Sequence, residues 1–156
     1  MDIYLIRHAI AEDKGQTKPD AERALTEKGR KRFRRVVRSL DRMDVRFDLL
    51  LHSPLLRAVQ TADMLMSLVR GESRVTGLLA ATPGGGLLDL MQGEGVGLVG
   101  HEPWMSEMLS LLLLGDIERA SSFSIGKGAV VWLSGKPVPG EATLMGMWSP
   151  AMLGKK

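Results

Sequence analysis

Cysteine is absent from the 156-residue chain. Its absence excludes a thiol nucleophile, a cysteine-based zinc site and any disulfide, and it is consistent with a reducing cytosol. A long apolar run is also missing. The four residues Ile3–Ile6 are too few for the apolar region of a signal peptide, and no stretch approaches the roughly 20 apolar residues of a membrane span. We therefore expect a cytoplasmic protein that has no membrane partner.

The order of apolar runs and breakers predicts one α/β domain that spans residues 1–156. Predicted strands cover residues 3–6, 47–51, 74–79 and 96–99, and predicted helices cover 27–40, 54–69, a short stretch ending near 91, and 103–114. Two further strands, 129–133 and 143–148, are expected to form a C-terminal hairpin or a pair of edge strands. Alternating strands and helices favour an α/β sandwich with a mostly parallel central sheet and extra C-terminal strands.

The basic residues are unevenly spread. Of the 21 lysines and arginines, seven fall within Lys28–Arg38, a stretch without an acidic residue. Such a run could bind nucleic acid or anionic lipid. Phe33, Val36, Val37 and Leu40 recur at helical spacing, however, and predict the buried stripe of a helix whose basic face is solvated. We favour this second interpretation, and we do not expect nucleic acid as a partner.

Arginine and histidine follow several of the predicted strands. In open α/β sheets, ligands bind beyond the carboxyl ends of the strands. The residues there are Arg7 and His8 after the first strand, His52, Ser53 and Arg57 after the second, and His101 and Glu102 after the fourth. Distant parts of the sequence are therefore expected to meet at one edge of the sheet.

These residue types suit a phosphoryl group. Arginine presents a planar fork of donors that matches phosphate oxygens and keeps its charge, and predicted helix starts at Ser53 and Pro103 add backbone donors. A neutral imidazole can attack phosphorus, whereas a charged one can stabilise negative charge. Taken singly, His8, His52 or His101 could be a structural residue. Their joint placement favours a pocket that binds a phosphate or sulfate anion.

Metal binding is the competing use of histidine. The sequence has no His-x-His and no His-Glu-x-x-His pattern, and the acids nearest to His8 are Glu12 and Asp13. Two arginines beside the site would repel a cation. We therefore expect no metal.

Four sequence motifs occur in order: LIRHA at 5–9, LTEKGR at 25–30, HSPLLRAVQTA at 52–62 and VGHEPWMS at 99–106. They resemble the motifs of the histidine phosphatase superfamily, also called the phosphoglycerate mutase-like or RHG family. The short chain and the forms RHAIAE and GHEP are most similar to its SixA branch, the small phosphohistidine phosphatases. The resemblance implies a three-layer α/β/α fold and a two-step hydrolysis that uses no metal or organic cofactor.

The resemblance also implies a role for each site residue. His8 resembles the nucleophile that becomes phosphorylated, and Arg7 resembles the first phosphate clamp. Arg57 corresponds to the second clamp, and His101 to the histidine that binds phosphate and stabilises the transition state. Phosphoryl transfer spreads negative charge over three oxygens, so fixed cationic donors around an in-line nucleophile meet its main requirement.

One departure from the larger family members bears on the substrate. Those members carry an acid after the third strand that protonates an alcohol leaving group, whereas the corresponding residues 78–91 have no acid before Asp89. The imidazole of phosphohistidine can leave already protonated and neutral, so the missing acid favours that substrate. Glu12 or Glu102 could substitute as general acid. The short insertions would also leave the site open to a side chain of another folded protein.

We therefore expect a phosphohistidine phosphatase that acts on a signalling protein, such as a histidine phosphotransfer domain. One alternative is a broad small-molecule phosphomonoesterase. Another is a non-catalytic module that binds phosphate or a phosphoprotein. Binding of nucleic acid or a membrane surface through residues 28–38 is the last candidate.

Overall fold

A six-stranded mixed sheet forms the centre of the molecule. The computed structural model describes residues 1–15 and 17–153. The strands are β1 (Asp2–Arg7), β2 (Phe47–His52), β3 (Val69–Val75), β4 (Gly95–Gly100), β5 (Val130–Gly135) and β6 (Ala142–Trp148). Their order in the sheet is β3-β2-β4-β1-β5-β6. The first four strands run parallel, and β5 and β6 are antiparallel additions beside β1.

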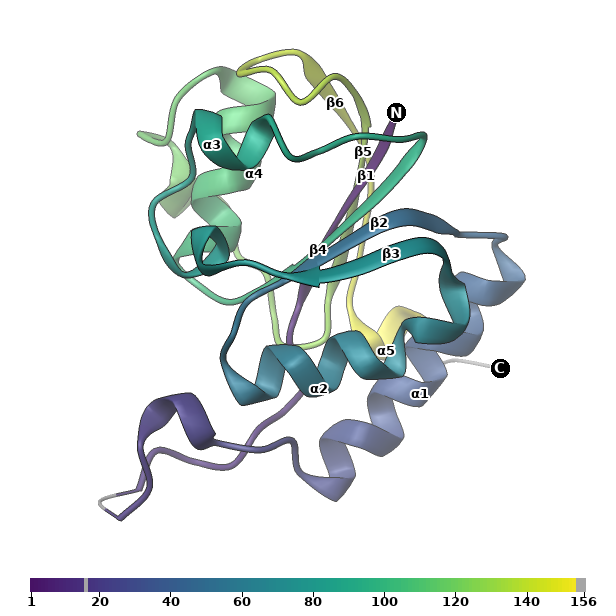
Figure 1. The fold of residues 1–156 in the computed structure, drawn as a ribbon, viewed down its shortest axis with the longest axis vertical. Coiled ribbons are helices and arrows are strands. Elements are labelled where there is room, and N and C mark those ends of the chain that lie inside the picture. Colours follow the sequence, from purple (N-terminus) through teal and green to yellow (C-terminus); the bar gives the residue numbers. More distant parts are fainter. Residues whose placement is uncertain (16, 154–156) are drawn as a thin grey trace.

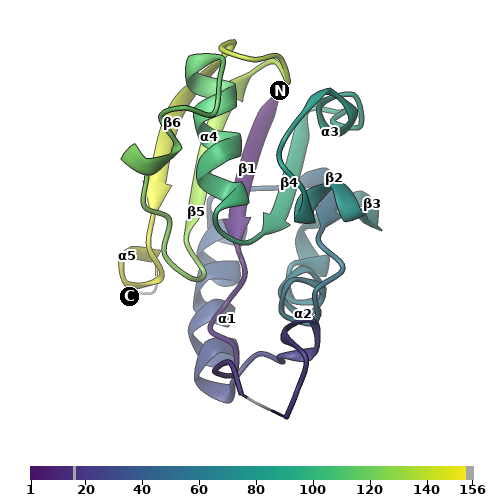
Figure 2. The same ribbon diagram turned by 90° about the vertical axis from the view of Figure 1, so that its left-hand side faces the viewer.

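Helices cover both faces of this sheet (Figures 1 and 2). One face carries α1 (Glu27–Arg42), α2 (Leu56–Met64) and α5 (Pro150–Leu153), and the other carries α3 (Gly85–Leu88) and α4 (Trp104–Leu114). Side chains of β1 alternate between the two layers: Ile3 and Leu5 join the core under α4, whereas Tyr4 and Ile6 join the core under α1. The predicted three-layer α/β/α arrangement is confirmed.

The first helix is encoded as predicted. The Thr26 hydroxyl accepts a hydrogen bond from the Gly29 amide at 3.0 Å and caps α1, and Phe33, Val36 and Leu40 form its buried stripe. Six of the seven cations in the run Lys28–Arg38 are exposed, and the seventh, Arg30, is partly buried. The helix therefore presents a solvated basic face.

The second predicted helix is present but shorter than expected, and the third predicted strand lies earlier in the chain than expected. The Ser53 hydroxyl accepts from the Leu55 amide at 3.2 Å, Leu55 has extended backbone angles, and α2 begins only at Leu56. The helix ends at Met64, and the chain enters β3 at Val69. This edge strand is largely exposed and polar, so it lacks the apolar pattern that identifies buried strands. Residues 77–79, predicted as the end of a strand, belong instead to a short 3₁₀ helix, Gly77–Ala80.

Two elements near the end of the chain complete the sheet. The predicted C-terminal hairpin is confirmed as β5 and β6, which pair antiparallel. Helix α5, which the sequence did not predict, follows β6 and packs on α1. No helix in residues 1–15 and 17–153 is long and apolar enough to cross a membrane.

Candidate active site

Three of the segments that follow parallel strands meet at one edge of the sheet. The His8 amide donates to the Gly100 carbonyl at 3.0 Å, and the Ser53 amide donates to the Val99 carbonyl at 3.0 Å. These bonds continue the pairing of β1 and β2 with β4 beyond the ends of the strands. The side chains predicted to form the site therefore start from a fixed backbone frame.

A cavity of about 360 Å³ lies at this edge, and all four predicted site residues line it. Its lining consists of Arg7, His8, Asp13, Lys14, Arg23, Arg57, His101, Glu102 and Lys127. Five of these residues are cationic and two are acidic, so the cavity favours an anion. Neither His52 nor Glu12 belongs to the lining.

His8 is held as a neutral imidazole. The side chain is 4% exposed, and burial lowers its pKa from 6.5 to about 4, with the charges of Arg57 and Arg7 acting in the same direction. Its Nδ1 lies 2.7 Å from the Ala9 carbonyl oxygen. Nδ1 must donate to that oxygen, so the lone pair of the neutral ring is on Nε2. A neutral imidazole with a free Nε2 can act as a nucleophile at pH 7.

The position of His8 is supported by α2. The Ala9 amide donates to the Thr61 hydroxyl at 3.1 Å, and that hydroxyl donates to the Arg57 carbonyl oxygen at 2.7 Å. Thr61 is fully buried. One hydroxyl group therefore ties the backbone beside the imidazole to the helix that carries Arg57.

The two predicted clamps are each anchored by part of the guanidinium. Arg7 donates from Nη1 to the Ile125 carbonyl at 2.7 Å. Arg57, 5% exposed, donates to the Asp20 carbonyl at 2.9 Å and to its carboxylate at 3.2 Å. The Nε of each arginine is buried without a partner among the described residues. These donors could hold phosphate oxygens.

His101 is also surrounded by cations. Burial lowers its pKa, and Arg57 and Arg7 lower it further. Nδ1 lies 3.3 Å from the Glu102 carbonyl, and Nε2 is buried without a partner in the described part of the chain. An anion in the cavity would offset the arginine charges and favour the protonated ring. His101 can then donate a hydrogen bond to a phosphoryl oxygen.

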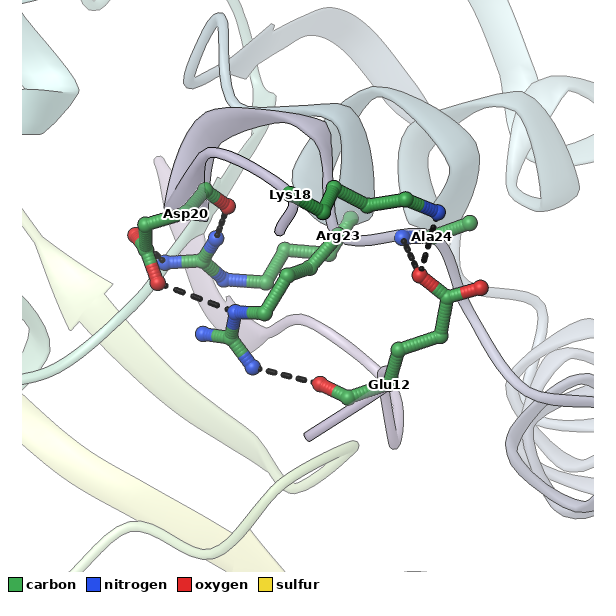
Figure 3. Close-up of polar contacts among 6 residues, drawn as sticks. Glu12, Lys18, Asp20, Arg23 and Ala24 are labelled. Carbon is green, nitrogen blue, oxygen red and sulfur yellow. Dashed lines mark hydrogen bonds and ion pairs between the residues drawn. The ribbon is translucent and has the colours of Figure 1, made fainter. Parts of the chain in front are cut away.

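The two candidate general acids lie in different places. Figure 3 shows Glu12 turned toward Lys18 and the Ala24 amide, at 2.9 and 3.2 Å. The hydrogen bond from Lys18 lowers the pKa of Glu12. Glu102 lines the cavity, and its Oε1 is buried without a partner in residues 1–15 and 17–153. Of the two carboxylates, Glu102 is the one that the fold brings to the cavity.

Arg23 is the main cavity residue that sequence reasoning missed. It is 9% exposed and donates to the Asp20 carboxylate at 2.9 Å and to the Glu12 carbonyl at 2.7 Å (Figure 3). Arg23 lies in a polar loop segment without periodicity, so no local pattern distinguishes it from solvated arginines. Its contacts hold the segment that also supplies Asp20 to Arg57.

The conserved pattern of the histidine phosphatase superfamily (branch 1) matches residues 3–80, half of the chain. The chain belongs to the histidine phosphatase superfamily. The chain is also similar to an uncharacterized protein of Picosynechococcus sp., which is 30% identical over 143 residues, covering 83% of this chain and 87% of that protein. The resemblance is confirmed at the level of the family, and three of the four motifs, at 5–9, 25–30 and 52–62, lie within the matched residues.

Solved structures of phosphatases share this fold. The protein histidine phosphatase SixA complexed with tungstate is similar with a TM-score of 0.79 and 23% identity, over 97% of this chain and 98% of that one. The alpha-ribazole phosphatase from Shigella flexneri has a TM-score of 0.73 and 19% identity, over 96% and 97%. At these identities the similarity shows the fold alone.

Proposed function

We propose that this chain hydrolyses phosphohistidine on a signalling protein through a phosphorylated His8 intermediate. The observation that carries the proposal is the neutral, buried imidazole of His8 in a cationic cavity that Arg7, Arg57 and His101 also line. A nucleophile without a proton on Nε2 and fixed donors for the phosphoryl oxygens are the two requirements of the reaction.

The proposed reaction has two steps. In the first, His8 Nε2 attacks phosphorus in line, the P–N bond of the substrate breaks, and the substrate imidazole leaves neutral because its other nitrogen already carries a proton. In the second, water attacks the phosphorus on His8, the new P–N bond breaks, His8 returns to its neutral form with the proton still on Nδ1, and inorganic phosphate leaves as the dihydrogen phosphate that carries both protons of the water. Arg7 and Arg57 bind the equatorial oxygens in both steps, and His101 donates to a third.

The course of the chain between β3 and β4 supports a substrate as large as a protein. In this segment Leu79, Leu87 and Met91 are buried in the core under α4, and none of its residues lines the cavity. It therefore packs as part of the α3 and α4 layer and supplies no general acid. A phosphohistidine side chain needs neither a covering segment nor that acid.

A second candidate is a small-molecule phosphomonoesterase. The observation that favours it is the position of Glu102, which lines the cavity. Its Oε1 is buried and has no hydrogen-bond partner among the described residues, so this carboxyl group could protonate an alcohol leaving group. The alpha-ribazole phosphatase from Shigella flexneri, which has the same fold, is consistent with this second candidate.

A substrate panel tests the proposal. Phosphate release is measured from a histidine phosphotransfer domain phosphorylated on its histidine, from phosphoramidate, and from sugar phosphates and nucleotides. We expect the phosphorylated domain to give the highest kcat/KM, and His8→Ala to lower it at least about 1,000-fold because the nucleophile is lost. Label from the phosphorylated domain, trapped by an alkaline quench, should be found on His8.

The matched control is His52→Ala. His52 also follows a strand at this edge, but it does not line the cavity, so this variant should keep activity within about twofold. Higher kcat/KM for sugar phosphates would favour the second candidate. A wild-type protein that releases no phosphate and traps no label would leave only a binding module.

A further inference from the structure

A second cavity lies beside the one that contains His8. Its volume is about 270 Å³, and its lining consists of Ala9, Ile10, Gly29, Arg32, Phe33, Lys127, Gly128 and Pro150. Lys127 lines both cavities, and Ala9 directly follows His8 in the chain. We call this second cavity the α1 groove, and it adjoins the site of the proposed chemistry.

Backbone contacts fix the α1 groove relative to His8. The Gly128 amide donates to the Arg7 and His8 carbonyl oxygens at 3.1 and 2.9 Å. On the opposite wall, Gly29 of α1 lies so close to the Ile10 carbonyl that an added Cβ would collide with it. A side chain seated in the groove would therefore be held at a constant position relative to the nucleophile.

The groove is bordered by unpaired positive charge. Arg32 lines it, and Lys28 and Arg35, at i−4 and i+3 on α1, lie on the same helix face. All three are exposed. The ion pairs formed by the described residues include none of them. This face is complementary to an acidic surface.

We propose that the α1 groove docks an acidic surface segment of the protein that carries the phosphohistidine. This proposal rests on the proposed function. An apolar side chain of the segment would contact the partly exposed Ile10 and Pro150, and its carboxylates would face Lys28, Arg32 and Arg35. Nucleic acid or lipid headgroups would use the cations but not the apolar lining, so the combination favours a protein. The groove thus selects a phosphoprotein over a free phosphoramidate by contacts outside the reacting centre.

The test compares Arg32→Glu with wild type on two substrates. One substrate is a panel of phosphorylated histidine phosphotransfer domains encoded in the same genome, and the other is phosphoramidate, which is too small to reach the groove. We expect Arg32→Glu to lower kcat/KM for the preferred domain about tenfold, mainly through KM, because it opposes like charges. Turnover of phosphoramidate should change less than about twofold.

Arg34→Glu is the matched control. It makes the same charge change on an exposed residue of the same helix, but Arg34 does not line the groove. We expect it to alter kcat/KM for the domain far less than Arg32→Glu. Equal losses in the two variants would overturn the docking proposal and leave the proposed function intact.

Two further outcomes would also overturn it. In one, Arg32→Glu leaves the phosphoprotein kinetics unchanged and instead weakens binding to DNA or to anionic phospholipid vesicles, which would assign the face to that ligand. In the other, wild type hydrolyses phosphoramidate but none of the phosphorylated domains, which would remove the proposed function together with its docking surface.

Discussion

At His8, burial and the neighbouring arginines act in the same direction. Both lower the pKa of the imidazole, so the ring stays neutral at pH 7 beside the guanidinium groups of Arg57 and Arg7. A solvent-exposed histidine with an ordinary pKa would be partly protonated at pH 7, and its protonated fraction could not act as a nucleophile. In the proposed reaction, the cations that attract the phosphoryl group therefore also keep the attacking nitrogen of His8 unprotonated.

Arg57→Ala tests the residue scale. The change removes a buried fork of donors and the anchor to Asp20, so we expect a loss of about 2–4 kcal/mol in transition-state stabilisation, read from kcat/KM. Arg57→Lys should recover little of it, because a point charge does not replace a bidentate fork. Arg74→Ala, at an exposed arginine on β3 paired with Glu72, is the control. An Arg57→Ala enzyme with nearly full activity would show that this residue is not a clamp.

At the scale of the element, α1 combines a local and a long-range determinant. The cap at Thr26 and the apolar stripe are local, and they determine which residues of the chain form the helix. Its distance from β1 depends on Gly29, where the helix approaches the backbone of Ile10. The Ile10 carbonyl oxygen also accepts from the Thr26 amide at 3.0 Å. The start of the helix is therefore locked to the segment that follows His8.

Gly29→Ala tests this packing. Alanine is the better helix former by about 1 kcal/mol, but its Cβ would meet a backbone carbonyl that cannot rotate away. Overpacking therefore decides the sign, and we expect the free energy of unfolding in urea to fall by about 1–3 kcal/mol. Gly77→Ala is the control, because nothing lies within 4 Å of a Cβ there. Equal stability of the two variants would contradict the close approach.

At the scale of the whole molecule, the site makes the stability of the fold depend on pH. Burial holds the pKa of His8 at about 4 in the folded state, against 6.5 ordinarily, and burial lowers the pKa of His101 as well. Between pH 4 and pH 6.5, His8 is largely protonated in the unfolded chain and largely neutral in the folded one, so the unfolded chain binds more protons. Acid therefore favours unfolding, and stability falls as the pH drops from about 6.5 toward 4.

His8→Gln tests this linkage. Glutamine does not titrate, so the variant should lose less stability than wild type between pH 7 and pH 4.5, by on the order of 2–3 kcal/mol, in urea unfolding. Some dependence should remain because His101 and the carboxylates still titrate. Identical pH dependence of the two proteins would mean that His8 is not buried as a neutral ring.

Elements that are defined by local sequence patterns were predicted correctly, whereas an element that depends on contacts between distant residues was not. Strands β1, β2 and β4 are buried on both faces and read as apolar runs, so they were located, and with them the candidate site residues at their ends. Strand β3 is a polar edge strand at the end of the sheet, paired with β2. Its position depends on that pairing, which leaves no periodic pattern in the chain.

The same distinction separates the site residues. By itself, the sequence determined the family, the alternating architecture and the order in which Arg7, His8, Arg57 and His101 reach the sheet edge, because strand-end motifs are short and local. Only the tertiary structure decided that Arg23 lines the cavity while Glu12 turns away to Lys18. It also decided that the groove under Arg32 adjoins His8. Each of these depends on how a loop or helix packs against residues distant in sequence, and no local pattern encodes that packing.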